Sequence, residues 1–304
     1  MAGSKKSHKR RLKKSEIVGF IVMALFIIAV IYVAIPSQHN EPLTSTSTAQ
    51  GQSTTTKPAL KAAIVDQLSV FSDSDFTDQA KRIMEQAGFR VDVYGPDKVK
   101  VDLYASISRS NYEIIVFRVH AGVNDQIASR PVGLFTTEPY SQFKYQSEQL
   151  NDLVGPAQAF NRSEVVFAVT PKFLREKSLG SYNDAVIILM GCFGLYSGDL
   201  PQAFVDRGAS VVVGWNELVD IRHTDRATLT LLRFTLLQKM SVDEAVTKTM
   251  NDVGADSTGS VLGYVPVEKG GFTFFQFSCE ILVTDRWKTI SDLDSQGFRD
   301  SAVN

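Results

Sequence analysis

Short, nearly continuous apolar runs alternate with stretches of helical spacing between residues 59 and 287. Apolar runs of this length predict strands that are buried on both faces. The predicted strands cover residues 62–65, 90–94, 112–119, 184–190 and 209–215, and the predicted helices cover residues 75–87, 200–207, 225–239 and 242–253. Strands that alternate with helices are typical of a parallel sheet with helices on both faces. We therefore predict an α/β domain with a mostly parallel sheet.

Local signals mark the ends of two predicted helices. Gly88 follows the first helix and is suited to end it. Ser241 precedes the last helix with Glu244 three residues later, which is the pattern of a capping box. A further apolar run at residues 164–169 is expected to pair beside a hairpin within residues 132–170.

Two of the predicted strands end in residues that can carry out nucleophilic catalysis. Residues 112–119 lead into His120-Ala121-Gly122, and residues 184–190 lead into Gly191-Cys192. The alternating pattern predicts that these two strands are neighbours in the parallel sheet. Ligands of open parallel sheets collect outside the carboxyl ends of the strands. The sequence therefore predicts a Cys–His pair at one sheet edge, as a thiolate–imidazolium pair or with His120 taking the thiol proton during attack.

The N-terminal segment predicts a membrane anchor. Residues 17–35 read IVGFIVMALFIIAVIYVAI and contain no charge. Nineteen residues at ~1.5 Å rise make a helix of about 28 Å, close to the ~30 Å hydrocarbon core of a bilayer. This stretch is long for a cleaved signal peptide, and no small-residue cleavage pattern follows it, so we favour an uncleaved single-pass anchor.

Charge and composition divide the rest of the chain. Residues 1–16 form a basic tail with seven Lys and Arg, which places the N-terminus in the cytoplasm and the C-terminal domain outside it. Residues 36–58 form a Ser/Thr-rich stalk with little to bury, and residues 288–304 form a polar C-terminal tail. The predicted localisation is therefore the cell membrane, with the domain at residues 59–287 extracytoplasmic.

The charge of the domain argues against nucleic acid as a partner. After residue 36 the chain carries 25 basic and 32 acidic residues, a net charge of −7, with no basic stripe. The sequence shows no phosphate-binding glycine loop and no clustered metal ligands, so we expect no metal and no cofactor. Peptides or proteins are the expected partners, together with the membrane at residues 17–35.

The two strand ends resemble those of caspase-like cysteine peptidases, the clan of caspases, legumains, gingipains, separases and CHAT-type domains. In that clan a catalytic His ends one core strand and the Cys ends the next, as His120 and Cys192 do here. The segment 200–220 and the later helices are most similar to CHAT-type domains. The resemblance covers residues 62–265 and implies a caspase-like α/β/α sandwich.

The resemblance also implies roles for the candidate residues. His120 would be the base and Cys192 the nucleophile of an endopeptidase, with backbone N–H groups at Cys192 and Gly122 stabilising the oxyanion. The chain departs from the family where His-Ala-Gly replaces His-Gly, where the caspase pentapeptide is missing, and in the 72-residue separation of His120 and Cys192, which requires a hairpin insertion in residues 125–175. A catalytically inactive binding or scaffolding module is the alternative.

Structural roles compete with catalytic ones at these residues. Free cysteines are usually buried for packing, and Cys192 has a possible disulfide partner in Cys279, within a predicted late strand at residues 274–280. His120 alone would be a structural histidine more often than a base. His223, flanked by charges, is expected to be solvated at a helix start.

A third segment supplies candidates for the substrate cleft. Trp215 ends the predicted strand 209–215. Glu217, Asp220 and Asp225 follow it and suggest an acidic pocket for Lys or Arg. An ordinary solvated acidic loop is the preferred reading of these acids. Trp215 is either an aromatic residue of the cleft or a residue of the core.

Overall fold

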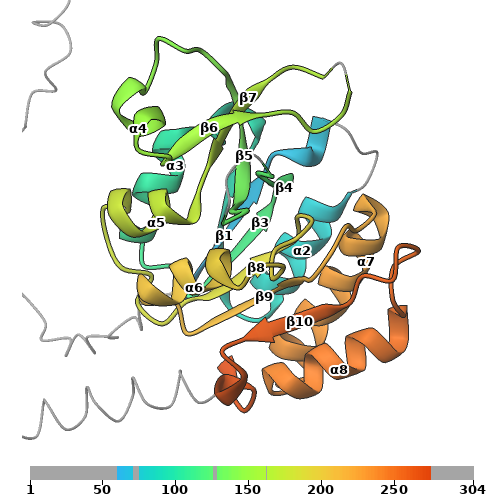
Figure 1. The fold of residues 1–304 in the computed structure, drawn as a ribbon. Helices are drawn as coiled ribbons and strands as arrows, with labels where there is room; N and C mark the ends of the chain where they lie inside the picture. Colours follow the sequence, from blue (N-terminus) through green and yellow to red (C-terminus); the bar gives the residue numbers. More distant parts are fainter. Residues whose placement is uncertain (1–59, 71–74, 126–128, 162, 275–304) are drawn as a thin grey trace, which may run out of the picture. The chain divides into compact units, whose positions relative to one another are not determined.

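Six strands form a mostly parallel sheet at the centre of the fold. The structure is a computed structural model that describes residues 60–70, 75–125, 129–161 and 163–274. The strand order is β10-β9-β8-β3-β1-β2, and only β10 runs antiparallel to its neighbour (Figure 1). The strands are β1 (Leu60–Asp66), β2 (Phe89–Tyr94), β3 (Ile114–Arg118), β8 (Val186–Leu189), β9 (Val211–Trp215) and β10 (Leu262–Val265). The predicted parallel sheet is confirmed, and β10 is a strand that the sequence analysis missed.

Helices cover both faces of this sheet (Figure 1). Side chains of a strand alternate between the faces, so Ile114 and Val116 of β3 enter one core cluster while Ile115 and Phe117 enter the other. The first face packs against α2 (Phe76–Gln86), α7 (Ile221–Leu232) and α8 (Val242–Val253), and the second against α3 (Val101–Ser106), α5 (Pro171–Lys177) and α6 (Asp199–Asp206). Burial on both faces explains why the strands of this sheet read as continuous apolar runs.

A second, antiparallel sheet is inserted between β3 and β8. Its order is β4-β5-β7-β6, and it packs on the face covered by α3, α5 and α6. Its elements are β4 (Ala121–Val123), β5 (Val132–Pro139), β6 (Val154–Ala157) and β7 (Val166–Val169), with the short helix α4 (Gln146–Leu150) between β5 and β6. The expected strand at residues 164–169 is confirmed as β7. The insertion is a complete small sheet rather than a single hairpin.

The ends of two helices agree with the local signals in the sequence, and the start of α7 differs from the predicted one. Gly88 ends α2 with φ +93°, and Ser241 and Glu244 form both bonds of the capping box of α8. The helix expected at residues 225–239 begins earlier, because the Asp220 side chain accepts from the first-turn N–H groups of α7. A π-helical turn, Arg233–Leu237, follows α7. The 3₁₀ turns are Leu68–Val70, Pro96–Lys98, Ile107–Arg109 and Val267–Lys269.

The predicted membrane anchor lies outside the described residues. The same holds for the basic tail at 1–16, the stalk at 36–58 and the C-terminal tail at 288–304. Within residues 60–274, as far as they are described, no helix is both long and apolar enough to cross a bilayer.

Candidate functional site

His120 stands at the junction of the two sheets. β3 ends at Arg118 and β4 begins at Ala121, so His120 lies between a strand of each sheet. Its backbone N–H donates to Oε1 of Gln67 at 2.7 Å, and its carbonyl accepts from the N–H of Phe135 at 2.9 Å. The Gln67 amide donates in turn to the Thr136 carbonyl at 2.7 Å. The end of β1 and strand β5 therefore hold the His120 backbone from two sides.

Cys192 follows β8 across a tight glycine step. The N–H of Met190 still bonds to the carbonyl of Phe117 at 3.0 Å, which continues the β3–β8 pairing beyond the end of β8. A Cβ atom added at Gly191 would lie 2.5 Å from the carbonyl oxygen of Val119 and 3.1 Å from the Ala121 Cβ. Only glycine leaves room for this approach, which brings the chain before Cys192 against the residues on both sides of His120.

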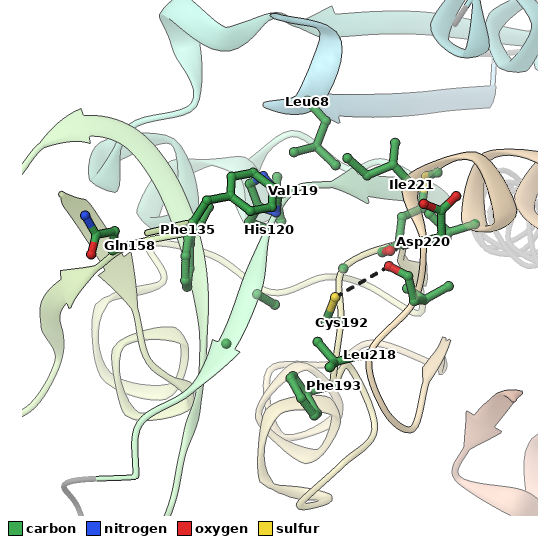
Figure 2. A pocket seen from close by; sticks show the side chains of 18 residues that line it. Leu68, Val119, His120, Phe135, Gln158, Cys192, Phe193, Leu218, Asp220 and Ile221 are labelled. Atoms are coloured by element: carbon green, nitrogen blue, oxygen red, sulfur yellow. Dashed lines mark hydrogen bonds between the residues drawn. The ribbon is translucent and has the colours of Figure 1, made fainter. Parts of the chain in front are cut away.

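The two candidate residues occupy matching positions at one sheet edge. β3 and β8 are parallel neighbours whose last paired residues are Phe117 and Leu189. His120 and Cys192 are each the third residue after that pair. Both line a cavity of about 510 Å³, seen from close by in Figure 2. The prediction that these strands are neighbours is confirmed.

The Cys192 thiol is half-buried and uncharged near neutral pH. Burial raises the pKa of the thiol, and the charge of Asp256 raises it further, although backbone groups at Val219 and at Cys192 itself lower it. The thiol donates to the Val219 carbonyl at 3.7 Å, shown as the dashed line in Figure 2. Cys192 is a free cysteine. Cys279, its possible disulfide partner, lies outside the described residues.

The His120 imidazole is also uncharged near neutral pH. Its half-buried ring lies edge-on to Phe160 at 5.3 Å between centroids, with Phe135 at 6.2 Å. Burial lowers the pKa of His120 below its ordinary value because the surroundings solvate the cation poorly. A raised thiol pKa and a lowered imidazole pKa favour a neutral pair. Of the two states expected for this pair, these pKa directions favour neutral partners over a resting thiolate–imidazolium pair.

Strand register decides which backbone N–H faces Cys192. Gly122 pairs with Gly133, and Ala121 with Leu134. Bonded and non-bonded pairs alternate along an antiparallel ladder, and the Phe135 N–H bond to His120 makes that position a bonded one. The N–H of Gly122 is therefore directed at β5, and that of Ala121 away from it. A Cβ atom added at Gly191 would lie 3.2 Å from the Ala121 nitrogen, so Ala121 is better placed than Gly122 as a donor beside Cys192.

Trp215 belongs to the core and does not line the cavity. Its side chain is 0% exposed, and its Nε1 donates to Oγ1 of Thr224 at 2.9 Å. Thr224 donates in turn to the carbonyl of Met190 at 3.2 Å. Of the two alternatives for Trp215, the structure supports the core residue and not the cleft candidate, because its strand ends under the start of α7. The indole supports the segment before Cys192 from within the core.

The acidic candidates have separate positions. Glu217 is exposed and lies outside the lining of the cavity. Asp220 is exposed at the cavity, and its Oδ1 accepts from the N–H groups of Arg222 and His223 at 2.9 and 3.3 Å. His223 was expected to be solvated, but its ring packs on Trp215 with centroids 5.3 Å apart, and its Nε2 is buried. These residues form no joint acidic pocket.

Asp225 lies in a buried ion cluster. Arg118, which is 1% exposed, donates from Nε and a terminal nitrogen to the two carboxylate oxygens of Asp225 at 2.8 and 2.9 Å. The other terminal nitrogen donates to Oδ1 of Asp66 at 2.9 Å. The expectation that Asp225 is solvated is therefore wrong. This cluster ties the ends of β1 and β3 to the start of α7, one residue before Gln67 and two residues before His120.

Sequence reasoning missed both the ion cluster and Gln67. Arg118 carried a usable signal, because it is a charge within the apolar run 112–119 and requires a buried partner. Asp66 and Gln67, directly after the first apolar run, carried no signal that would separate them from a solvated turn. No group of residues that could hold a metal ion is found among the described residues.

Comparison with models of protein families finds none that matches this chain, and comparison with curated proteins finds no match either. The geometry of the cavity and the resemblance in the two strand ends are therefore the observations that bear on function.

Proposed function

We propose that the chain is a caspase-like cysteine endopeptidase in which His120 is the general base and Cys192 the nucleophile. The observation that carries the proposal is their equivalent position, three residues beyond the last pair of two neighbouring strands and at one cavity. A buried Cys with no catalytic role needs no histidine at the matching position of the next strand. Both residues follow the carboxyl ends of their strands, where ligands collect in open α/β sheets, and this supports the proposal.

The neutral state of the pair suits a concerted first step. The Cys192 sulfur would attack the peptide carbonyl carbon while the thiol proton passes to His120. Backbone N–H groups at Cys192 and at the Ala121–Gly122 step would stabilise the oxyanion of the tetrahedral intermediate. The C–N bond would then break as His120 returns the proton to the leaving amine, which leaves a thioester at Cys192.

Hydrolysis of the thioester completes the cycle with the same groups. His120 would take a proton from an attacking water molecule, and the hydroxide oxygen would bond to the acyl carbon. The C–S bond would break as the sulfur regains the proton. The protein ends the reaction unchanged, and no oxidant, metal or cofactor is needed.

The fold supports the caspase-like assignment at two points. The sheet is mostly parallel with helices on both faces, as the resemblance implies. The insertion β4–β7 with α5 occupies the chain between β3 and β8, which accounts for the long separation of His120 and Cys192. The departure at His-Ala-Gly is compatible with catalysis because the Ala121 N–H is directed away from β5.

Single substitutions in the full-length protein test the proposal. Cys192→Ala should abolish hydrolysis of a fluorogenic peptide library while preserving the circular dichroism spectrum. His120→Ala should lower both hydrolysis and the rate at which iodoacetamide alkylates Cys192. Cys279→Ala is the matched cysteine control and should keep activity near wild type. Loss of activity or of the fold in Cys279→Ala, as severe as in Cys192→Ala, would instead support the disulfide.

A catalytically inactive binding module is the second candidate. The observation in its favour is that the thiol donates to the Val219 carbonyl and that burial raises its pKa, as in an unreactive cysteine. This candidate predicts that neither His120→Ala nor Cys192→Ala changes any peptidase activity, because the wild-type protein has none. The same library assay separates the two functions.

We also propose that residues 17–35 anchor the chain with its α/β domain outside the cytoplasm. The uncharged run and the basic residues before it support this orientation. Protease added to intact cells should remove the domain and leave an N-terminal epitope tag protected. A domain that is cut only after lysis would contradict the orientation.

A further inference from the structure

The cavity beside Cys192 is walled mostly by apolar side chains. They come from separate segments and include Leu68, Phe135, Phe160, Met190, Leu218 and Ile221. In Figure 2, Leu68 and Ile221 lie on one side of the cavity and Leu218 beside the thiol. The volume of about 510 Å³ falls within the ~300–1,000 Å³ typical of sites for small molecules, so a large side chain has ample room.

Two apolar side chains of the wall are left exposed. Phe160 is 54% exposed and Leu218 is 52% exposed, and both line the cavity. Phe160 lies on the insertion and Leu218 on the segment after β9. An apolar group that enters between them would remove their surfaces from water together with its own, which favours binding.

The charged groups of the wall do not select a charged ligand. Among the described lining residues, the ionisable ones besides Cys192 are His120 and Asp220. Burial lowers the pKa of His120, so its ring is neutral near pH 7. The carboxylate of Asp220 already accepts from two N–H groups at the start of α7, where the helix dipole compensates a negative charge.

We infer that the cavity binds a large apolar side chain, such as that of Leu, Met or Phe, on the substrate residue whose carbonyl Cys192 attacks. This inference rests on the proposed peptidase function and specifies its substrate class. The side chain of that residue branches one bond away from the attacked carbon. It must therefore enter the space next to the sulfur, and this space is the apolar cavity.

A peptide library that varies only the residue before the scissile bond tests the inference in the full-length protein. Leu, Met or Phe should give kcat/KM at least about ten-fold above Ala, Lys, Arg or Asp, since each methylene buried in an apolar pocket is worth roughly ten-fold or more in discrimination. Preference for Lys, Arg or Asp, with Cys192→Ala inactive, would overturn the inference and leave the peptidase proposal standing. A library without any Cys192-dependent cleavage would overturn both.

A charged residue introduced into the wall of the cavity provides a second test of the inference. Leu218→Glu should lower kcat/KM for the apolar substrates about ten-fold or more and raise the relative rate for Lys and Arg. Leu179→Glu is the matched control, because Leu179 is 54% exposed and does not line the cavity, and it should keep the wild-type profile. Phe160→Glu tests a wall residue that lies on the insertion. Unchanged specificity in both wall variants would overturn the inference.

Discussion

The backbone N–H of His120 donates a 2.7 Å hydrogen bond to the side-chain oxygen of Gln67. The other end of the Gln67 amide donates to the Thr136 carbonyl, so one side chain links the end of β1, the candidate base and β5. The backbone of Gln67 is itself bonded to the Arg118 carbonyl at 3.0 Å. Gln67 is therefore placed to position His120 without touching a substrate.

Gln67→Met should lower kcat/KM at least about ten-fold. Met preserves the volume of the buried side chain but leaves the His120 N–H and the Thr136 carbonyl without this partner, at a cost of about 1–3 kcal/mol each. The loss should fall on kcat more than on KM, because orientation of the base is disturbed. Gln79→Met, on α2, is the control. Equal effects on kcat and KM, or none, would contradict a positioning role.

The raised pKa of Cys192 predicts slow alkylation at neutral pH. In a Cys279→Ala background, Cys192 is the one cysteine left. Its reaction with iodoacetamide should be slower at pH 7 in the folded protein than in urea, where the pKa returns to about 8.5. The folded protein should gain rate as pH rises above 9. Faster alkylation in the folded state at pH 7 would show a stabilised thiolate.

The lowered pKa of His120 predicts where activity is lost in acid. The base must be neutral, so the acid limb of kcat/KM should lie below pH 6.5. The free energy of unfolding should also decrease as pH falls, for the same reason. As pH falls, the unfolded chain binds a proton on His120 at a higher pH than the folded chain does. The contribution of His120 to the free energy of unfolding is therefore complete above pH 6.5 and is lost as pH falls through the folded pKa. The pH profile of kcat/KM measures the acid limb, and urea unfolding at several pH values measures stability. An acid limb above pH 6.5 would contradict His120 as the base.

Gly191→Ala should reduce activity strongly. The added Cβ would lie 2.5 Å from the Val119 carbonyl oxygen, so the segments that carry His120 and Cys192 must move apart. We expect kcat/KM to fall about 100-fold, the loss expected from a displacement of about 1 Å at a reacting pair. Gly155→Ala in β6 is the matched control, since no atom lies within 4 Å of its added Cβ. Steady-state kinetics on both variants would show whether activity requires the close contact between Gly191 and the Val119 carbonyl.

Asp225→Ala should destabilise the fold by about 3–5 kcal/mol, because it leaves the buried Arg118 charge only partly compensated. Asp206→Ala removes an exposed partner of the half-buried Arg175 and should cost about 0–1 kcal/mol. Urea unfolding measures the free energy of both variants. Similar losses in the two variants would mean that burial of the Arg118 cluster adds little.

Local signals predicted five of the six strands of the main sheet and the helices α2, α6, α7 and α8, but they missed β10, α3 and α5. Continuous apolar runs such as β3 and β8 can be buried only between two layers of helices, and Ser241 with Glu244 begins α8 as the capping pattern predicts. The strand ends at His120 and Cys192 followed from the same periodicity. Their position at one edge needed one further rule, that chemistry collects at the carboxyl ends of parallel strands.

The residues around the pair could not be assigned from the sequence. Gln67 and Phe135 are separated from Cys192 by more than fifty residues. Only the fold brings Phe135 to the cavity that Cys192 lines and Gln67 against the His120 backbone. Asp225 was misjudged and Trp215 was left open between cleft and core for the same reason, since burial depends on which element covers a residue and not on its neighbours in the chain. The β4-β5-β7-β6 sheet was recognised only as a hairpin, because its strands are short and bend at a bulge.

The sequence by itself therefore determined most strands and helices of the main sheet and the two chemically competent strand ends. These depend on periodicity and on local backbone preferences, which neighbouring residues encode. Only the tertiary structure decided that burial raises the pKa of Cys192 and lowers that of His120, that the Ala121 N–H is directed away from β5, and that the cavity wall is mostly apolar. Desolvation and long-range contact set these properties, and both arise only when distant segments pack together.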